Sequence, residues 1–346
     1  KNNIIARYVR KHGIDITDEE RTSLIEKLSG CVTGYGKHPG RVMLIPDYAG
    51  RTEEIFAVRK GKNGEKISIP DYYDYDNIFY SIDLLWSSQL DHLVRVADLT
   101  GIPQESISLD DEDVAKELVL KGEEQILGIT GMYDLWSPFA AEVLQMCQVK
   151  DFAGLVKLLS LIHGTGVWSG NGEEIISQRE AGFDEIIASR DDIFDYLVGI
   201  GFSDRDSFKI AERVRKGKGL LPEQEEDLIR KGVPEWYIQS CNKIRYLFPR
   251  AHSLSYAVVH WRLLYFRSHY PEQFYRAHLE CVHITDCARE LIASGVDAIQ
   301  KRLEEISMEQ IQENDIYGPV DRSEEHALQV ALLMYERGYR IPQIGK

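Results

Sequence analysis

The chain has 346 residues, of which 43% are hydrophobic and 28% are charged. This length is enough for about two domains, and the composition is that of a folded protein with a buried core, not of a disordered one. No apolar run approaches the roughly 18 residues that a membrane span requires, which excludes a transmembrane protein. The five cysteines form no C-x-x-C pair and follow no signal peptide, so we expect reduced thiols and a cytoplasmic location.

The net charge of −15 argues at first against nucleic acid, because phosphates are bound by lysine and arginine and repelled by an acidic surface. The charge is unevenly distributed, however. Between Arg205 and Arg276 there are 14 lysines and arginines against 8 aspartates and glutamates, a balance of +6 that leaves −21 for the rest of the chain. The sequence therefore predicts one basic segment within an acidic protein.

The first 90 residues are expected to form two helices and a few short strands. Residues 2–12 and 17–29 have helical spacing, and the second helix opens on Thr17 and Glu20, which form a capping-box pattern. A turn is expected at 35–40. The dipeptide Asn63-Gly64 predicts a tight hairpin, because it tolerates positive φ. The expected strands are 41–45, 55–59, 66–69 and 79–85.

From about Asp91 onward the spacing of apolar residues becomes helical. Helix starts are indicated at Leu109-Asp110-Asp111, Ser137-Pro138, Asp151, Arg190 and Asp206. A long helix is predicted at 251–270, ended before Pro271. The fold class is thus mainly α with a small β portion (α+β), in which strands give way to helices near residue 90. A second boundary is expected near Glu280, where the basic segment ends.

A further helix is predicted to open at Pro234 and to stop at Pro249, because proline suits the first turn of a helix and interrupts its interior. Apolar residues within it repeat at four, three and four residues, which predicts one buried face. That face consists of Tyr237, Cys241, Ile244 and Phe248.

Cations and glycines are interleaved in Arg213-Val214-Arg215-Lys216-Gly217-Lys218-Gly219. Glycine lets a backbone approach a ligand closely, while flanking cations meet phosphate oxygens. The segment is not a Walker A loop, since no serine or threonine follows a Gly-Lys pair. The alternative is the solvated C-terminus of a helix, whose dipole favours lysine and arginine. The sequence leaves both interpretations open.

Cations and aromatic rings alternate in Lys243-Ile244-Arg245-Tyr246-Leu247-Phe248-Pro249-Arg250-Ala251-His252. Surfaces that handle single strands or nucleotides have this character, because cations neutralise phosphates and rings stack on bases. The alternative is an amphipathic helix whose rings lie in the core, which we favour for Phe248. Tyr256, one helical turn beyond His252, fits either interpretation.

Three polar motifs are ambiguous. The carboxylates of Arg190-Asp191-Asp192 suit the positive end of a helix dipole, whereas the guanidinium can clamp a triphosphate. His163 lies in a polar turn between apolar helices, where a lone histidine is usually structural. The acidic loop Asp71 to Asp76 is expected to be solvated, since it lacks the ligand spacing of a calcium loop.

Together these motifs resemble the C-family, PolC-type α subunit of bacterial DNA polymerase III. Weaker similarity extends back to His38-Pro39-Gly40 and forward to 336–339, so that it covers most of the chain. The sequence begins at Lys1 and not at a methionine, which indicates a piece of a longer polypeptide. The segments that carry the resemblance most densely are 158–165 (LLSLIHGT), 190–193 (RDDI), 214–220 (VRKGKGL), 233–238 (VPEWYI) and 248–252 (FPRAH).

The resemblance implies three regions. Residues 1–90 would be a partial palm of helices and a small sheet, and residues 91–280 helical fingers that fold over the incoming nucleotide and template. Residues 281–346 would be a C-terminal helical extension that leads toward a duplex-binding region missing here. The residues implied in binding dNTP and DNA are His163, Arg190, Arg215, Lys216, Lys218, Lys243, Arg245, Arg250, His252 and Tyr256.

The resemblance also implies one catalytic, metal-binding residue, Asp83, because the family has an aspartate on a palm strand at this place. Two-metal phosphoryl transfer needs carboxylates that hold both Mg²⁺ ions against the 3′-hydroxyl and the α-phosphate. The family's other two ligands form an Asp-x-Asp pair upstream of the residues present here. We therefore expect this chain alone to be inactive and to bind Mg²⁺ weakly.

The palm segment departs from the family pattern, whereas the fingers motifs are mostly intact. The loop between Cys31 and His38 is short and lacks the family's Lys-Arg pair, and residues 86–90 replace a Gly-His-Asp-Asp-Pro motif. In the fingers, Gly166 stands in place of an acidic residue.

Two hypotheses follow. The first is a part of a replicative DNA-directed DNA polymerase, whose partners are primer-template DNA, dNTP, a sliding clamp and other replisome subunits, without a membrane. The alternative is a catalytically inactive, polymerase-like protein that binds DNA or another partner.

Overall fold

The structure is a computed structural model that divides into two compact units, residues 1–86 and 87–346. Each unit is described by itself. The residues that the structure describes are 16–27, 41–44, 58–60, 64, 66–68, 80–84, 87–122, 124–282, 284, 286–313 and 323–340.

The first unit contains one described helix, α2 (Asp18–Lys27), and two pairs of short strands. The capping box that opens α2 is confirmed: the Glu20 N–H donates to Thr17 Oγ1 at 3.2 Å and the Thr17 N–H to the Glu20 carboxylate at 2.8 Å. The antiparallel strand pairs are β1 (Arg41–Leu44) with β4 (Tyr80–Asp83), and β2 (Val58–Lys60) with β3 (Lys66–Ser68).

The predicted hairpin is confirmed, with Gly64 at a φ of +81° between β2 and β3. The predicted helix 2–12, the turn 35–40 and the acidic loop 71–76 lie outside the described residues.

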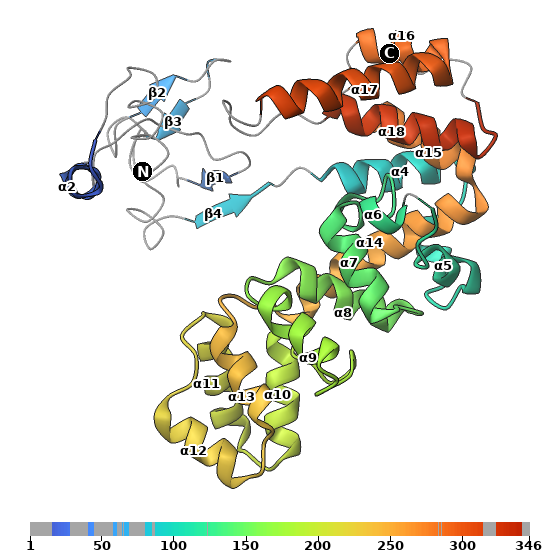
Figure 1. Ribbon diagram of the computed structural model, residues 1–346. Coiled ribbons are helices and arrows are strands. Elements are labelled where there is room, and N and C mark those ends of the chain that lie inside the picture. The colour runs from blue at the N-terminus through green and yellow to red at the C-terminus, as the bar shows by residue number, and fades with distance from the viewer. Residues whose placement is uncertain are drawn as a thin grey trace. The chain divides into compact units, whose positions relative to one another are not determined.

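The second unit is helical, so the mainly α fold class with a small β portion is confirmed (Figure 1). No helix among the described residues is long and apolar enough to span a membrane. The helices are α4 (Ser88–Thr100), α5 (Glu112–Glu117), α6 (Glu124–Leu127), α7 (Pro138–Cys147), α8 (Phe152–His163), α9 (Glu173–Ser177), α10 (Arg190–Gly199), α11 (Asp204–Arg215), α12 (Pro222–Arg230), α13 (Glu235–Lys243), α14 (Arg250–His269), α15 (Pro271–Cys281), α16 (Asp286–Ser294), α17 (Val296–Glu313) and α18 (Ser323–Glu336).

The helices begin where side chains satisfy the free backbone amides of a first turn. As predicted, Asp111, Ser137 and Asp151 cap α5, α7 and α8. Helix α11 begins two residues before its predicted start at Asp206, because Ser203 supplies the capping oxygen. Local hydrogen bonding thus sets most helix starts in this unit.

The core of the second unit is built around α14, which packs against α4, α5, α8 and α15. Trp261 and Leu264 on α14 are almost completely buried. The same helix buries the guanidinium of Arg267, which forms ion pairs with Glu117 and Glu124 next to α5 and α6. These contacts hold α14 rigidly at the centre of the unit, and its N-terminus reaches α10.

The predicted helix 234–248 is wrong in its second half. Helix α13 ends at Lys243, and Ile244 is extended with φ −60° and ψ 133°. Beyond Ile244 the backbone pairs with Thr165, Arg215 and Arg190 and not with its own helix. Tyr237, Cys241 and Ile244 are buried as predicted, but Phe248 is only half-buried and Leu247 is buried in its place.

Candidate nucleic-acid interface

One extended segment, residues 244–249, brings the predicted site residues together. Thr165 and Tyr246 exchange backbone hydrogen bonds of 2.9 and 3.1 Å, which join the segment to the end of α8. The Leu247 N–H donates to the Arg215 carbonyl at 3.1 Å, at the end of α11. On the other side the Arg190 N–H donates to the Phe248 carbonyl at 3.1 Å. Motifs far apart in the sequence therefore meet along one strand-like stretch.

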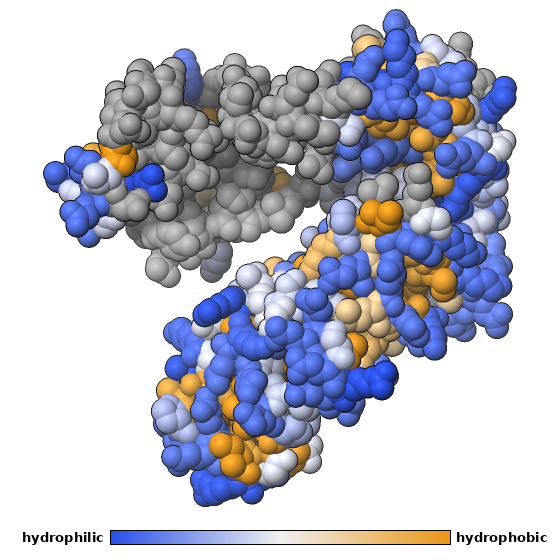
Figure 2. Space-filling model, in the orientation of Figure 1, coloured by the Kyte–Doolittle hydropathy of each residue, from blue (hydrophilic) through white to orange (hydrophobic). Residues whose placement is uncertain are grey.

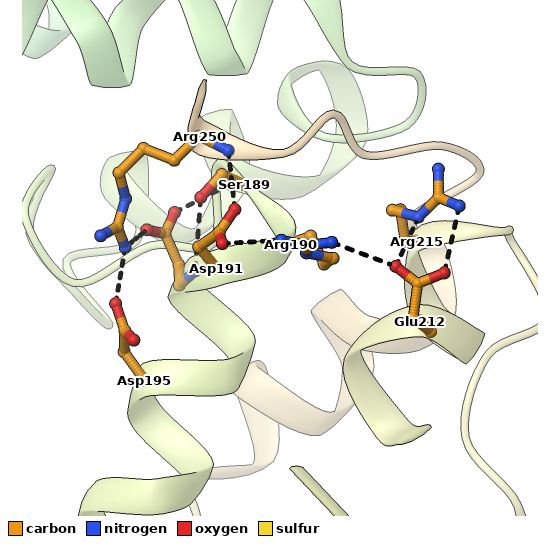
Figure 3. Close-up of polar contacts among 8 residues, drawn as sticks. Ser189, Arg190, Asp191, Asp195, Glu212, Arg215 and Arg250 are labelled. Atoms are coloured by element: carbon orange, nitrogen blue, oxygen red, sulfur yellow. Dashed lines mark hydrogen bonds and ion pairs between the residues drawn. The ribbon is translucent and has the colours of Figure 1, made fainter. Parts of the chain in front are cut away.

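Arg190 projects from a firmly capped helix start (Figure 3). Ser189 and Asp192 form a reciprocal capping box: the Asp192 N–H donates to Ser189 Oγ at 3.3 Å, and the Ser189 N–H to the Asp192 carboxylate at 2.8 Å. Asp191 accepts from the Arg190 guanidinium at 2.9 Å and from the Arg250 N–H at 2.7 Å. Burial raises the pKa of Asp191, but these hydrogen bonds outweigh it, and the pKa lies below its usual value. Both carboxylates thus stabilise the helix start that presents the guanidinium.

A single carboxylate, Glu212, holds three of the predicted cations (Figure 3). Both of its oxygens accept from Arg215, at 2.9 and 3.1 Å. Arg190 and Lys216 each lie 3.5 Å from it. The Arg215 hydrogen bonds are the main cause of a lowered pKa of Glu212. The cations at the start of α10 and the end of α11 therefore all contact the same carboxylate, that of Glu212.

Arg250 and Lys243 are also paired with acids. Arg250 donates to Asp192 at 2.9 Å and to Asp195 at 2.8 Å. Lys243 donates to Glu174 at 2.7 Å and to the Gly170 carbonyl at 2.8 Å. The geometry of each ammonium or guanidinium group is thus set by carboxylates from neighbouring helices.

These ion pairs correct the prediction of a strongly basic segment. Lys218 and Arg245 are the predicted cations that form no ion pair with any described residue. Four of the neutralising carboxylates lie outside Arg205–Arg276, so a count along the sequence overstates the local positive charge. Figure 2 shows a mostly hydrophilic surface over α10 to α12, interrupted by hydrophobic residues. The paired groups are Arg190, Arg215, Lys216, Lys243 and Arg250 with Glu174, Asp191, Asp192, Asp195 and Glu212.

The glycine-containing motif forms the C-terminal turn of α11. The helix ends at Arg215, and Gly217 and Gly219 follow with φ of +70° and +59°. A Cβ on Gly217 would lie 2.3 Å from the Arg245 carbonyl oxygen. The interpretation as a helix C-terminus is thus confirmed, and the glycine permits close backbone approach to the extended segment. The role of Lys216 and Lys218 in phosphate binding stays a prediction.

Five rings form a continuous aromatic row beside these cations, made of His163, Tyr246, Phe248, His252 and Tyr256. Phe248 stacks on His252 with ring centroids 4.1 Å apart and an angle of 15°. Tyr246 meets Phe248 edge-on at 4.9 Å, and His163 meets Tyr256 edge-on at 4.9 Å. Burial and the neighbouring His163 lower the pKa of His252, which favours its neutral form. The row presents apolar ring surface next to the cation Arg215.

Tyr246 links the cations of the site to the aromatic row. Its hydroxyl accepts from Arg215 at 3.2 Å, and the guanidinium carbon lies 5.6 Å from the centre of the ring. Phe248, predicted to lie in the core, is instead a half-buried member of the aromatic row. Cations and rings therefore form one surface.

Asp83 lies in the first unit, at the end of β4 and opposite Arg41 of β1. It is the one carboxylate residue of this strand pair. A two-metal centre requires several carboxylates, so the described strand pair does not by itself fit two Mg²⁺ ions. The metal-binding role of Asp83 stays a prediction.

Sequence reasoning missed four acidic residues of the site, Glu174, Asp195, Glu212 and Asp134. Glu212 stands three and four residues before Arg215 and Lys216, a spacing that places such pairs side by side on a helix, so it was detectable. Asp134, which lies 3.8 Å from His163, is 29 residues away in the sequence and gave no local signal.

Comparisons with known proteins relate the chain to one family. The family model of the bacterial DNA polymerase III alpha subunit finger domain matches residues 88–235. The PolC-type DNA polymerase III of Bacillus cereus is 33% identical over 353 residues, which cover 97% of this chain and 24% of that protein. The corresponding protein of Thermotoga maritima is 31% identical over 350 residues, covering 97% and 25%.

The PolC-type DNA polymerase III of Caldanaerobacter subterraneus is 30% identical over 351 residues, which cover 98% of this chain. The match includes 25% of that protein, so the chain spans about a quarter of the length of these relatives. The similarity runs through both units and not only through the helical one. The chain therefore belongs to the PolC-type family of bacterial DNA polymerase III α subunits, and includes the region that the finger-domain model describes.

Proposed function

We propose that residues 91–280 act as the fingers of a replicative DNA polymerase, binding an incoming dNTP and the template strand. The observation that carries this proposal is the extended segment 244–249, which places the aromatic row beside Arg190 and Arg215. A nucleotide requires both: ring surface for its base and cations for its phosphates. The match of the finger-domain model supports the same assignment.

The carboxylates give the proposed site a defined geometry at the cost of affinity. Because Glu212 and Asp191 already accept from the guanidinium groups, phosphate oxygens must compete with them. We expect weak binding of single-stranded DNA. Lys218 and Arg245 are the unpaired cations among the described site residues. A plot of the logarithm of the affinity against the logarithm of the salt concentration should therefore have a slope of about −1.4.

Binding is tested with charge-reversal variants and a fluorescent oligonucleotide. Arg245→Glu and Lys218→Glu should each weaken binding about tenfold and make its salt dependence shallower, because each removes a phosphate contact. The control is Lys121→Glu, an exposed lysine just before α6. Unchanged affinity of both site variants would contradict the proposed interface.

For catalysis we propose that Asp83 supplies one ligand to Mg²⁺, in a centre completed by carboxylates from outside the β1–β4 strand pair. The chain is joined to a palm segment that carries an Asp-x-Asp pair and is assayed for primer extension. Extension that is lost in Asp83→Ala supports the polymerase function. Absence of extension by the joined protein, with DNA binding retained, would favour the alternative of an inactive DNA-binding relative.

A further inference from the structure

Asp134 lies behind the aromatic row, on the short 3₁₀ turn Tyr133–Leu135. One of its oxygens, Oδ2, accepts from Gln89 Nε2 at 2.8 Å. The same oxygen lies 3.8 Å from Nε2 of His163 and 3.5 Å from Nε2 of His260. One carboxylate oxygen thus faces three side chains from three helices.

The connection to the row runs through His163. Its ring packs edge-on against His252 at 5.3 Å and against Tyr256 at 4.9 Å. Its other nitrogen, Nδ1, is buried and has no hydrogen-bond partner among the described residues. The electrostatic attraction between Nε2 and Asp134 is therefore the polar interaction that orients this ring.

A second neighbour of Asp134 is His260, which is fully buried on α14. Its Nδ1 lies 2.9 Å from the Tyr256 carbonyl, an acceptor, so Nδ1 carries the proton. Nε2 therefore has a lone pair, and it has no hydrogen-bond partner among the described residues although it lies 3.5 Å from Asp134. The link from Asp134 to the aromatic row therefore runs through His163.

Asp134 is itself held in its ionised form. Burial raises its pKa, but the interaction with His163, the nearby His260 and the Gln89 amide outweigh that effect, and its pKa is lowered. A fixed negative charge at this point therefore persists at neutral pH. The carboxylate is 31% exposed and touches no phosphate-binding cation through an ion pair among the described residues.

We propose that Asp134 is a positioning residue for base stacking, which holds His163 so that the aromatic row keeps its geometry. This rests on the proposed function, because the row is the surface on which bases would stack. The substrate class is the unpaired base of a template strand or incoming nucleotide. Asp134 touches neither; it acts through the rings in front of it.

Asp134→Asn tests the proposal, since it keeps the shape and removes the charge. The probe is a single strand of about 12 nucleotides that contains 2-aminopurine, whose fluorescence is quenched when its base stacks. We expect binding to weaken about tenfold, as for the loss of one stacked base, with a smaller quench. The salt dependence should not change, because the cations are untouched.

Glu142→Gln is the matched control, because Glu142 is another acid that holds an aromatic ring, accepting from Trp168 Nε1 at 3.0 Å. Asp134→Glu, which restores the charge, should recover part of the quench. If Asp134→Asn does not fold, His163→Asn tests the same link, since it leaves the carboxylate with Gln89 and His260. A wild-type quench in whichever of these two variants folds would overturn the proposal.

The imidazole nitrogens give a second readout that does not depend on DNA. In ¹⁵N spectra of the 346-residue chain, Asp134→Asn should shift the His163 resonances, whereas Glu142→Gln should not. If the wild-type chain fails to bind the strand, the proposed function fails, whatever the imidazole spectra show. If the chain binds and Asp134→Asn leaves both the quench and the imidazole shifts unchanged, only the role of Asp134 is refuted.

Discussion

Gly217 shows how much the site depends on single atoms. It has a φ of +70°, and the position of its missing Cβ is 2.3 Å from the carbonyl oxygen of Arg245. Both the backbone conformation and the close approach exclude a side chain. The glycine allows the end of α11 to lie against the extended segment, which is what places Arg215 beside Tyr246.

We expect Gly217→Ala to lower the free energy of unfolding by about 2–4 kcal/mol, from strain at positive φ together with displacement of the extended segment. Urea denaturation measures this change. Gly199→Ala is the control, because its added Cβ meets no atom within 4 Å and its φ is not in the left-handed region. Equal stability of the two variants would show that the contact at Gly217 is not tight.

His92 is a buried histidine away from the site. Its Nε2–H donates to the Phe274 carbonyl at 3.0 Å, and its ring lies 5.1 Å from that of His278. Burial lowers the pKa of His92 to about 4, although the hydrogen bond to Phe274 opposes this. Burial and the neighbouring His92 also lower the pKa of His278. Both rings are therefore neutral in the folded protein.

The folded-state pKa of His92 lies below the ordinary value of 6.5, so the unfolded chain takes up a proton first as the pH falls. Stability should be complete above pH 6.5 and should decline between pH 6.5 and 4, by about 3 kcal/mol from this group. Thermal unfolding at several pH values tests this. His92→Gln should flatten the acid-side decline, whereas His269→Gln, at a half-exposed site, should not. An identical pH dependence in His92→Gln and wild type would refute the assignment.

At the scale of elements, α10 and α11 contribute to the site through their opposite ends. Helix α10 presents Arg190 at its start, and α11 presents Arg215 and Lys216 at its end, all around Glu212. Both helices begin with a serine N-cap, Ser189 and Ser203. The caps are chemically alike, but only Ser189 adjoins the site. Comparing substitutions at the two serines therefore distinguishes an effect on stability from an effect on binding.

Ser189→Ala and Ser203→Ala should each lower the free energy of unfolding by about 1 kcal/mol, the usual value of an N-cap. Only Ser189→Ala should also weaken oligonucleotide binding, because its loss frees the turn that holds Arg190 and Asp192. The two variants are compared by denaturation and by fluorescence anisotropy. Equal binding by both would indicate that the cap supports the helix alone.

At the scale of the whole molecule, the buried core belongs to one unit. Every member of the described hydrophobic cluster lies at or beyond Leu93, and the boundary between the units falls between residues 86 and 87. The described strands of the first unit are short and leave Val42, Leu44 and Ile82 about half exposed. The helical unit thus has the means to fold by itself.

We expect residues 87–346, expressed alone, to keep the thermal transition and the oligonucleotide affinity of the full chain. Circular dichroism and anisotropy measure both. The physical reason is that removing residues 1–86 removes no described residue of the core. Aggregation or a much lower melting temperature of the shorter chain would contradict this expectation. It would show that the second unit needs the first to keep its apolar surface away from water.

Much of the fold could be predicted from local patterns. Capping residues such as Asp111, Ser137 and Asp151 mark helix starts because they satisfy backbone amides within the next three residues. The end of α13 at Lys243 could not be predicted this way, because the apolar spacing continues to Phe248. There the backbone finds partners in Thr165, Arg190 and Arg215, which no local pattern contains.

By itself the sequence determined the family, the mainly helical fold class and the kinds of residue in the site, since these depend on motifs and local hydrogen bonding. The tertiary structure alone decided which charges distant in the sequence meet. Glu174 pairs with Lys243, and Asp192 and Asp195 pair with Arg250. Asp134 likewise lies near His163 and His260 across the fold. Electrostatic interactions depend on distance in space, which the order of residues does not specify.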